Sequence, residues 1–221
     1  MKRLPTPALL TLLALLSVTL APGEEFTNIP RPTPPFVAAV PARCAWTIAV
    51  QNKTLPAPAP GAVPRPDNRV SEVRSTQVDG VRRDIVVLGD TGTSEYWYLP
   101  GVRFWTTLQH DVDAAPTATQ DPLDPFPSSP RGFPGVQWVN LASYDQPVRF
   151  QKIICYHYTA AGDHEAWIDV ETRMPVAYKG PDASYQYTFA APPDGALTPP
   201  APYQAAMDKY RQIMSHITPA N

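Results

Sequence analysis

Apolar and polar residues alternate most regularly in the last third of the chain, between positions 148 and 189. A period of two is the pattern of a strand that buries one face. Within each run, the apolar residues of one parity are Val148, Phe150, Ile154, Tyr156 and Tyr158, then Ala166, Ile168 and Val170, then Val176 and Tyr178, and finally Tyr185, Tyr187 and Phe189. Short polar turns separate the runs, so the pattern predicts successive antiparallel strands.

A hairpin signal lies upstream, in residues 70–88, where Asp79-Gly80 stands between two valines. This dipeptide favours a two-residue turn, which sets the register of the strands on either side. The expected cross-strand partners are Val73 with Val86 and Ser71 with Leu88. Residues 43–51 predict an earlier strand, and residues 94–99 and 102–108 predict another hairpin. The expected partners there are Trp97 with Phe104 and Tyr96 with Trp105.

Two shorter elements complete the pattern. Residues 136–139 predict a short strand, and residues 202–217 predict an amphipathic helix. Apolar side chains four, three, four and three residues apart form one stripe of that helix. The stripe consists of Tyr203, Met207, Tyr210, Met214 and Ile217. We expect it to pack against the sheet.

Proline accounts for 29 of the 221 residues, far above the usual share of about 5%. It argues against a helical protein and divides the strands from several irregular segments. Residues 24–41 predict an extended, polyproline-like arm. Residues 110–135 predict a long loop, and because loops of that length are uncommon without a function, we expect this one to act as a lid.

The first residues have the features of a secretory signal peptide: Lys2 and Arg3, then an apolar run at 8–20 that is too short to span a bilayer comfortably. Small residues favour cleavage after Gly23. The expected organisation is therefore a signal peptide at 1–23, the arm at 24–41 and a single β-rich domain at 42–221. The mature chain is expected to be soluble in the periplasm or outside the cell, and not to span a membrane.

The formal net charge is −2, and it becomes −4 without Lys2 and Arg3. A mature chain with this charge offers no basic surface to nucleic acid. Two cysteines in an exported chain indicate one disulfide, between Cys44 and Cys155. It would stabilise the fold by about 4–5 kcal/mol through the long loop that it closes. The alternative is two separate buried thiols. A disulfide needs Cα atoms within roughly 7 Å, and the sequence does not give that distance.

No motif in the chain specifies a reaction. A G-x-S-x-G elbow is absent, and Cys155 and His157 on one strand would point in parallel rather than at each other. The acidic clusters at His110–Asp113 and Asp163–Glu165 match no metal-site spacing. We therefore predict no catalytic residue, no metal ligand and no cofactor.

The predicted strands carry a surplus of aromatic residues. Such rings can fill an ordinary sheet core, or they can line a cleft for an apolar ligand. The candidate cavity residues are Trp97, Tyr98, Trp105, Trp138, Trp167, Tyr185 and Tyr187. Residues 113–135 would form the rim of that cavity.

The stretch Trp167-Ile168-Asp169-Val170-Glu171-Thr172-Arg173-Met174-Pro175-Val176 resembles the W-I-D-x-x-T-x-L-P-V hairpin of periplasmic lipoprotein carriers of the LolA-like family and the related mycobacterial lipid carriers. The motif Gly135-Val136-Gln137-Trp138-Val139 and the cysteine in Lys152-Ile153-Ile154-Cys155-Tyr156 fit the same resemblance. It covers about forty residues well. It implies a curved antiparallel half-barrel, closed by helices, whose cavity takes acyl chains, and it brings no catalytic residues. Where those carriers have an N-terminal helix, this chain has prolines.

Together these features predict a mainly β fold, a curved antiparallel LolA-like half-barrel with a C-terminal amphipathic helix. The expected function is non-catalytic binding of a lipid or other apolar small molecule in the cell envelope, between the sheet and the helix. The alternative is a structural or interaction module with a filled core, which would use the proline-rich arms to contact an envelope protein. A hydrolase that depends on His110, His157 or His164 is the third possibility.

Overall fold

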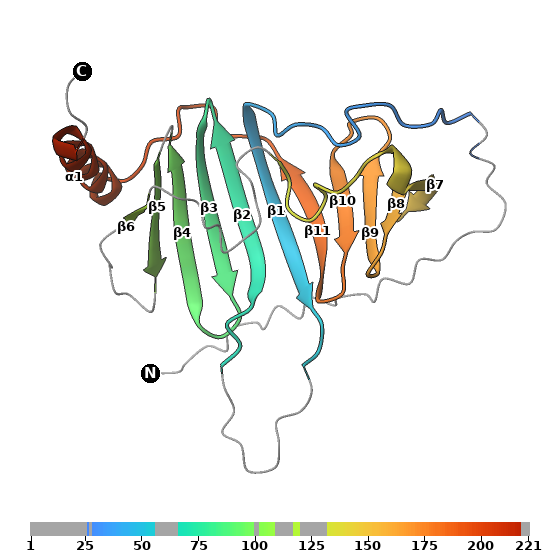
Figure 1. Cartoon of the computed structure of the whole chain (residues 1–221), viewed down its shortest axis with the longest axis horizontal. Helices are drawn as coiled ribbons and strands as arrows, with labels where there is room; N and C mark the ends of the chain where they lie inside the picture. The colour runs from blue at the N-terminus through green and yellow to red at the C-terminus, as the bar shows by residue number, and fades with distance from the viewer. Residues whose placement is uncertain are drawn as a thin grey trace, which may run out of the picture.

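The structure is a computed structural model of the whole chain, and it describes residues 26, 28–55, 66–99, 102–108, 117–119 and 132–217. The described chain is mainly β, with one antiparallel sheet and one C-terminal helix (Figure 1). The strands are β1 (Arg43–Asn52), β2 (Val70–Val78), β3 (Val81–Leu88), β4 (Gly92–Leu99), β5 (Val102–Leu108), β6 (Thr117–Thr119), β7 (Tyr144–Phe150), β8 (Ile153–Ala160), β9 (His164–Asp169), β10 (Pro175–Lys179) and β11 (Ala183–Ala190). A 3₁₀ helix, η1 (Leu141–Ser143), precedes β7, and the helix α1 spans Ala201–Ile217. The predicted signal peptide, residues 1–23, lies outside the described residues.

The sheet is curved and unclosed, which confirms the predicted curved antiparallel architecture. Its strand order is β6-β5-β4-β3-β2-β1-β11-β10-β9-β8-β7. The pairing of β1 with β11 at the centre joins two meanders, one built from β1 to β6 and the other from β7 to β11. The two free edges are therefore β6 and β7.

The strand order explains why a long connection precedes β7. Strands β6 and β7 follow each other in sequence but lie at opposite edges of the sheet. Since neighbouring strands are about 4.8 Å apart, the chain has to travel tens of ångströms between them. The described end of this connection, residues 132–143, packs on one face of the sheet, and so does the described part of the arm, residues 28–41. We call this face the arm face, and the opposite face the helix face.

The largest hydrophobic cluster lies on the arm face. It includes Trp46 and Ile48 of β1, Tyr156 and Tyr158 of β8, and Tyr187 of β11, all buried. Four partly buried residues of the arm pack against it, namely Ile29, Phe36, Val37 and Val40. The proline-rich arm therefore covers part of the core.

The helix α1 packs on the helix face through its first two turns, with Tyr203, Ala206 and Met207 in the cluster around Trp97. The rings of Tyr203 and Trp97 have centroids 5.9 Å apart, and the Tyr203 hydroxyl lies 3.3 Å from a carboxylate oxygen of Glu95. The other Glu95 oxygen accepts hydrogen bonds from the Trp97 indole and from Arg83, at 2.9 and 2.6 Å. The predicted helix is confirmed, and Figure 1 places it beside the β6 edge. Among the described helices, none is long and apolar enough to cross a membrane.

Most of the predicted strand registers are confirmed. Val73 faces Val86, Trp97 faces Phe104, and Tyr96 faces Trp105. The predicted pairing of Ser71 with Leu88 is wrong, because the register shifts between Val70 and Glu72 and brings Val70 opposite Leu88. The Asp79-Gly80 turn sets the register of the residues near it. It carries no information about a bulge at the far end of the hairpin.

Two other sequence-based expectations are wrong. The alternation from Val148 to Tyr158 does not belong to one strand, because a turn at residues 151–152 divides it into β7 and β8. Gln151 has a φ of 56°, and Val148 faces Cys155 across the hairpin, so Val148 lies on the opposite face from Tyr156. Residues 136–139 form turns rather than a strand.

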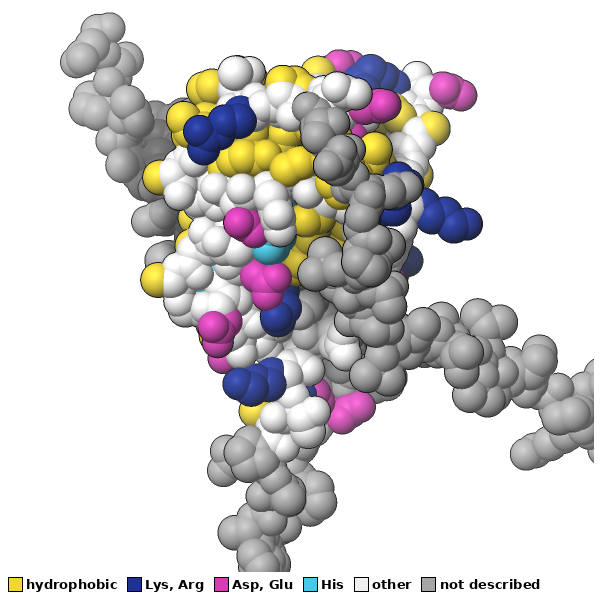
Figure 2. Space-filling view, turned by 90° about the vertical axis from the view of Figure 1, so that its right-hand side faces the viewer, with side chains coloured by type: hydrophobic (Ala, Val, Ile, Leu, Met, Phe, Trp, Pro, Cys, Tyr) yellow, Lys and Arg dark blue, Asp and Glu magenta, His cyan; other side chains and the backbone are white. Residues whose placement is uncertain are grey.

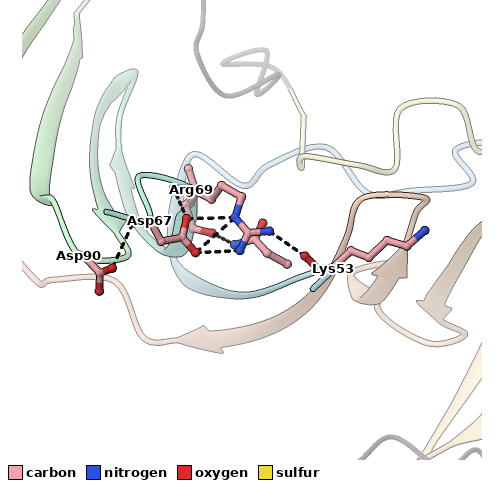
Figure 3. A network of polar contacts seen from close by, with 6 residues as sticks. Lys53, Asp67, Arg69 and Asp90 are labelled. Carbon is pink, nitrogen blue, oxygen red and sulfur yellow. Dashed lines mark hydrogen bonds and ion pairs between the residues drawn. The ribbon is translucent and has the colours of Figure 1, made fainter. Parts of the chain in front are cut away.

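A polar network joins two loops at one end of the sheet (Figure 3). The Arg69 guanidinium donates to both carboxylate oxygens of Asp67 and, at 2.7 Å, to the carbonyl of Lys53. The backbone of Asp67 exchanges hydrogen bonds with Asp90, through the Asp90 carboxylate at 3.0 Å and the Asp90 amide at 2.7 Å. The network thus ties the ends of β1 and β2 to the turn between β3 and β4.

The predicted disulfide is not formed, since Cys44 and Cys155 are both free and buried. Cys44 belongs to the cluster on the arm face, whereas Cys155 belongs to a second cluster with Val148 and Trp167. Three strands, β11, β10 and β9, separate β1 from β8. Four interstrand steps amount to roughly 19 Å in a flat sheet, well beyond the reach of a disulfide.

Candidate functional site

An open apolar groove of about 400 Å³ lies on the arm face. Arm residues 35–39 form one wall, and the other wall consists of Gly132, Phe133, Val136, Gln137 and Val139. Figure 2 shows the molecule from the side of β7, and hydrophobic side chains gather in the upper part of this view. The volume lies at the low end of the range for small-molecule sites, and the lining is predominantly apolar, as such sites require.

Hydrogen bonds to the sheet hold the arm wall in place. The amide of Ala38 donates to the carbonyl of Arg173 at 2.8 Å, in the turn between β9 and β10. The hydroxyl of Tyr156 donates to the carbonyl of Pro30 at 3.0 Å. Because proline has no amide hydrogen, these contacts use the few polar backbone groups that such a segment can offer.

Aromatic packing holds the second wall. The ring of Phe133 makes edge contacts with Trp46 of β1 and with Phe189 and Tyr187 of β11, at centroid distances of 5.5, 5.6 and 6.4 Å. The Tyr187 hydroxyl donates a hydrogen bond to the carbonyl of Pro134. Burial raises the pKa of Tyr187 well above its usual value, so its hydroxyl remains a donor. Phe133 is therefore the anchor of this segment.

Polar groups are also buried on the arm face, beneath the arm. Tyr144, Tyr156 and Tyr158 form a cluster in which the rings of Tyr156 and Tyr158 each lie 5.8 Å from that of Tyr144. The guanidinium of Arg173 lies over the Tyr156 ring at 4.5 Å. Burial raises the pKa of Tyr158, and the nearby positive charge of Arg173 opposes that rise. The floor of this region is thus aromatic, with two adjacent cations, Arg173 and Arg31, since the Arg31 guanidinium lies 5.7 Å from the centre of the Tyr144 ring.

The structure divides the predicted cavity residues between the two faces of the sheet. On the helix face, Trp97 packs on Tyr203 and Trp167 stacks on Phe150 and His157. Their alternation with Tyr98 on β4 and with Ala166 and Ile168 on β9 places both on that side. These two rings are therefore remote from the groove.

The other candidate rings belong to the arm face or to the segment that covers it. Tyr185 packs on Tyr178 at 5.0 Å, Tyr187 packs on Phe133, and Tyr98 contacts the guanidinium of Arg82 at 5.4 Å. Trp138 donates from its indole nitrogen to the carbonyl of Gly135 at 2.7 Å, within the segment of residues 132–143 that covers the arm face. Trp105 lies on β5 opposite Tyr96, and its side chain lies outside the described residues, as does most of the predicted rim at 113–135.

Sequence reasoning missed the residues that line the groove. Phe36, Val37 and Phe133 stand within proline-rich segments with no strand or helix period. Their only signal is that large apolar side chains occur at all in segments that were expected to be loops. Gly132–Gly135 were included in the predicted rim, and this part of that prediction agrees with the position of the groove.

Of the three described histidines, His157 and His164 lie on the sheet in different settings, and His216 lies on the exposed part of α1. His157 lies on the helix face between two carboxylates, with Asp145 Oδ2 3.1 Å from its Nδ1 and Glu165 Oε2 3.3 Å from its Nε2. Lys179 donates to the other Glu165 oxygen at 2.5 Å, and its hydrogen bond helps to lower the pKa of Glu165 against the effect of burial. His164 contacts the Tyr178 hydroxyl at 2.8 Å on the arm face. His110 lies outside the described residues.

The neighbouring Cys155 does not have the properties of an activated nucleophile. Burial raises the pKa of its thiol to about 12, whereas a nucleophilic cysteine needs a lowered pKa. Its sulfur lies 3.7 Å from the carbonyl of Ile153, which is the hydrogen-bond partner of a structural thiol. Within the described part of the chain, no group of three or more His, Cys, Asp or Glu side chains is placed to hold a metal ion.

Neither the protein-family models nor the curated proteins with which the chain was compared include a match. The groove and the groups beside it are therefore the basis for a functional proposal.

Proposed function

We propose that the protein is an exported, non-catalytic binding protein of the cell envelope that holds a lipid or another apolar ligand in the groove between the arm and residues 132–139. The observation that carries the proposal is the groove itself, about 400 Å³ of space with mainly apolar walls. Binding there would bury apolar surface that the folded chain leaves open to water.

The LolA-like relationship remains part of this proposal. In support of it, the motif at 167–176 forms the β9–β10 hairpin, and the sheet is curved, antiparallel and unclosed. The side chain of Asp169 accepts hydrogen bonds from the amides of Glu171 and Thr172, at 2.7 and 3.1 Å, which accounts for the acid at that position of the motif. The groove, however, lies beside the arm, whereas the sequence led us to expect a cavity beneath the helix.

One observation favours a second candidate function. Phe133 occupies the centre of the arm face, where it packs on three core rings. Phe133 thus fills the core of the arm face, as expected for an interaction module without a ligand cavity. In that case the arm and the covering segment would present a surface to an envelope protein.

The Ala39→Trp substitution tests the proposal. Ala39 is exposed and lines the groove, so a large side chain there would fill the space without disturbing the core. We expect the wild-type protein to bind an environment-sensitive, uncharged apolar dye such as N-phenyl-1-naphthylamine, and Ala39→Trp to weaken the binding about tenfold or more. Fluorescence titration of the mature protein measures both affinities.

Ala142→Trp is the matched control. Ala142 is also exposed but belongs to η1 and does not line the groove. Its affinity for the dye should equal that of the wild type. If the wild type binds no dye, or if both tryptophan variants bind like the wild type, the groove is not a ligand site and the filled-core alternative is the better account.

A further inference from the structure

Among the described residues of the arm face, Arg173 is a cation without an acidic partner. It belongs to the turn between β9 and β10, and its guanidinium lies over the Tyr156 ring. Its Nη1 atom is buried and has no hydrogen-bond partner among the described residues. A buried donor without an acceptor is destabilising, and more so when it is charged. Such an atom calls for an acceptor that the described residues do not supply.

Tyr158 presents a second orphan donor in the same cluster. The residue is 0% exposed, and its hydroxyl has no partner within the described part of the chain. The guanidinium of Arg173 is close enough to counter the effect of burial on the pKa of this hydroxyl. Two buried donors beside each other, one of them charged, match a single anionic acceptor better than they match an apolar group.

The two donors do not line the groove, but they belong to the cluster that contacts the arm, and the arm forms one wall of the groove. The backbone of Arg173 accepts the hydrogen bond of Ala38, and Ala38 lines the groove. Phe36 and Val37 of the same wall pack on the core cluster that contains Tyr156 and Tyr158. A molecule in the groove would therefore have apolar walls along its length, and its polar end would have to pass beneath the arm to meet the two donors.

We propose that the Arg173 guanidinium and the Tyr158 hydroxyl bind the carboxylate of a long-chain fatty acid whose hydrocarbon chain occupies the groove. The inference rests on the proposed function and narrows its ligand from any apolar molecule to an anionic amphiphile. Arginine suits this role because its planar guanidinium matches the two oxygens of a carboxylate. The Tyr158 hydroxyl would donate to one of the same oxygens.

The test compares two ligands of equal chain length, hexadecanoate and hexadecanol, by displacement of the dye at pH 8. We expect the wild type to bind hexadecanoate about tenfold more tightly, as a hydrogen-bonded ion pair implies. Arg173→Gln should abolish this preference and leave the affinity for hexadecanol unchanged. Tyr158→Phe should reduce the preference severalfold. Arg74→Gln is the control, because Arg74 pairs with Glu72 on the helix face and its loss should not alter the preference.

Tyr158→Phe also separates binding from folding. Removing an unpartnered hydroxyl should leave the urea midpoint of unfolding unchanged or higher, so a loss of hexadecanoate affinity would not reflect a damaged fold. Equal binding of the two ligands by the wild type would overturn the inference while leaving the proposed function intact. An equal loss of affinity for hexadecanoate and hexadecanol in Arg173→Gln would also overturn the inference and leave the proposed function intact. If the wild type binds neither ligand nor the dye, the proposed function itself fails.

Discussion

A close approach between residues 132–143 and the sheet depends on a single residue, Gly135. Its φ is +75°, in the left-handed region that side chains other than glycine rarely adopt. A Cβ atom built at this position would lie 2.9 Å from Cδ1 of Tyr178 and 3.0 Å from Cε2 of Tyr185. Its carbonyl also accepts the Trp138 indole. The absence of a side chain here allows the segment to lie flat on the arm face.

Gly135→Ala should therefore destabilise the protein. Both the positive φ and the contact with two tyrosine rings oppose the substitution, and we expect a loss of about 1–3 kcal/mol in the free energy of unfolding. Urea denaturation measures it. Gly132→Ala is the matched control, because a Cβ at position 132 meets nothing within 4 Å, and its effect should stay below about 0.5 kcal/mol. Equal losses in the two variants would contradict this account of Gly135.

At the scale of elements, the loops at one end of the sheet are joined through Asp67 and Arg69. Hydrogen bonds from the Arg69 side chain and backbone lower the pKa of Asp67 from 3.8 to about 2. The folded pKa lies below the unfolded one, so the folded state favours the ionised carboxylate. The resulting stability is fully present above about pH 4, and it is lost as the pH falls through about 2.

Asp67→Asn should destabilise the protein at pH 7, and the difference from the wild type should shrink between about pH 4 and pH 2. The reason is that acid protonates Asp67 in the wild type and removes the ion pair that the variant lacks at every pH. Urea midpoints at pH 7, 4 and 2.5 measure the trend. Asp208→Asn, in the exposed part of α1, is the control, and its urea midpoint should equal that of the wild type at each pH. A constant difference between Asp67→Asn and the wild type would contradict the assignment.

At the scale of the whole molecule, the open sheet has two faces with separate cores. The arm face is covered by two irregular segments, the arm and residues 132–143, and the helix face carries smaller clusters around Trp97 and Trp167. Cys44 and Cys155 lie in different clusters. The fold is thus stabilised by packing on both faces, without a covalent link between them.

The protein should therefore contain two free thiols that are protected by folding. Burial raises the pKa of both, and iodoacetamide reacts with the thiolate, so neither should be alkylated in the native state at pH 8. Both should be alkylated in 6 M guanidinium chloride without a reductant. Intact-mass measurement counts the adducts, and a reductant should not change the thermal midpoint. Failure to alkylate before reduction would show a disulfide and would contradict the structure.

The candidate site could be predicted only in part. Local alternation and the Asp79-Gly80 turn predicted most strands and the partners of Val73 and Trp97, because the period of a strand and the geometry of a tight turn are local properties. The groove residues Phe36 and Phe133 have no such local signal. They lie close together because the arm and the connection to β7 meet on one face, which no neighbouring residue specifies.

The sequence by itself determined the class of fold: antiparallel strands from alternating residues, and a C-terminal helix from the stripe that begins at Tyr203. The tertiary structure alone decided the strand order, with β1 beside β11, and consequently the face on which each ring lies. It separated Cys44 from Cys155, and it placed the groove beside the arm. The physical reason is range: alternation and turns depend on adjacent residues, whereas pairing between distant strands depends on how the whole chain buries its apolar surface.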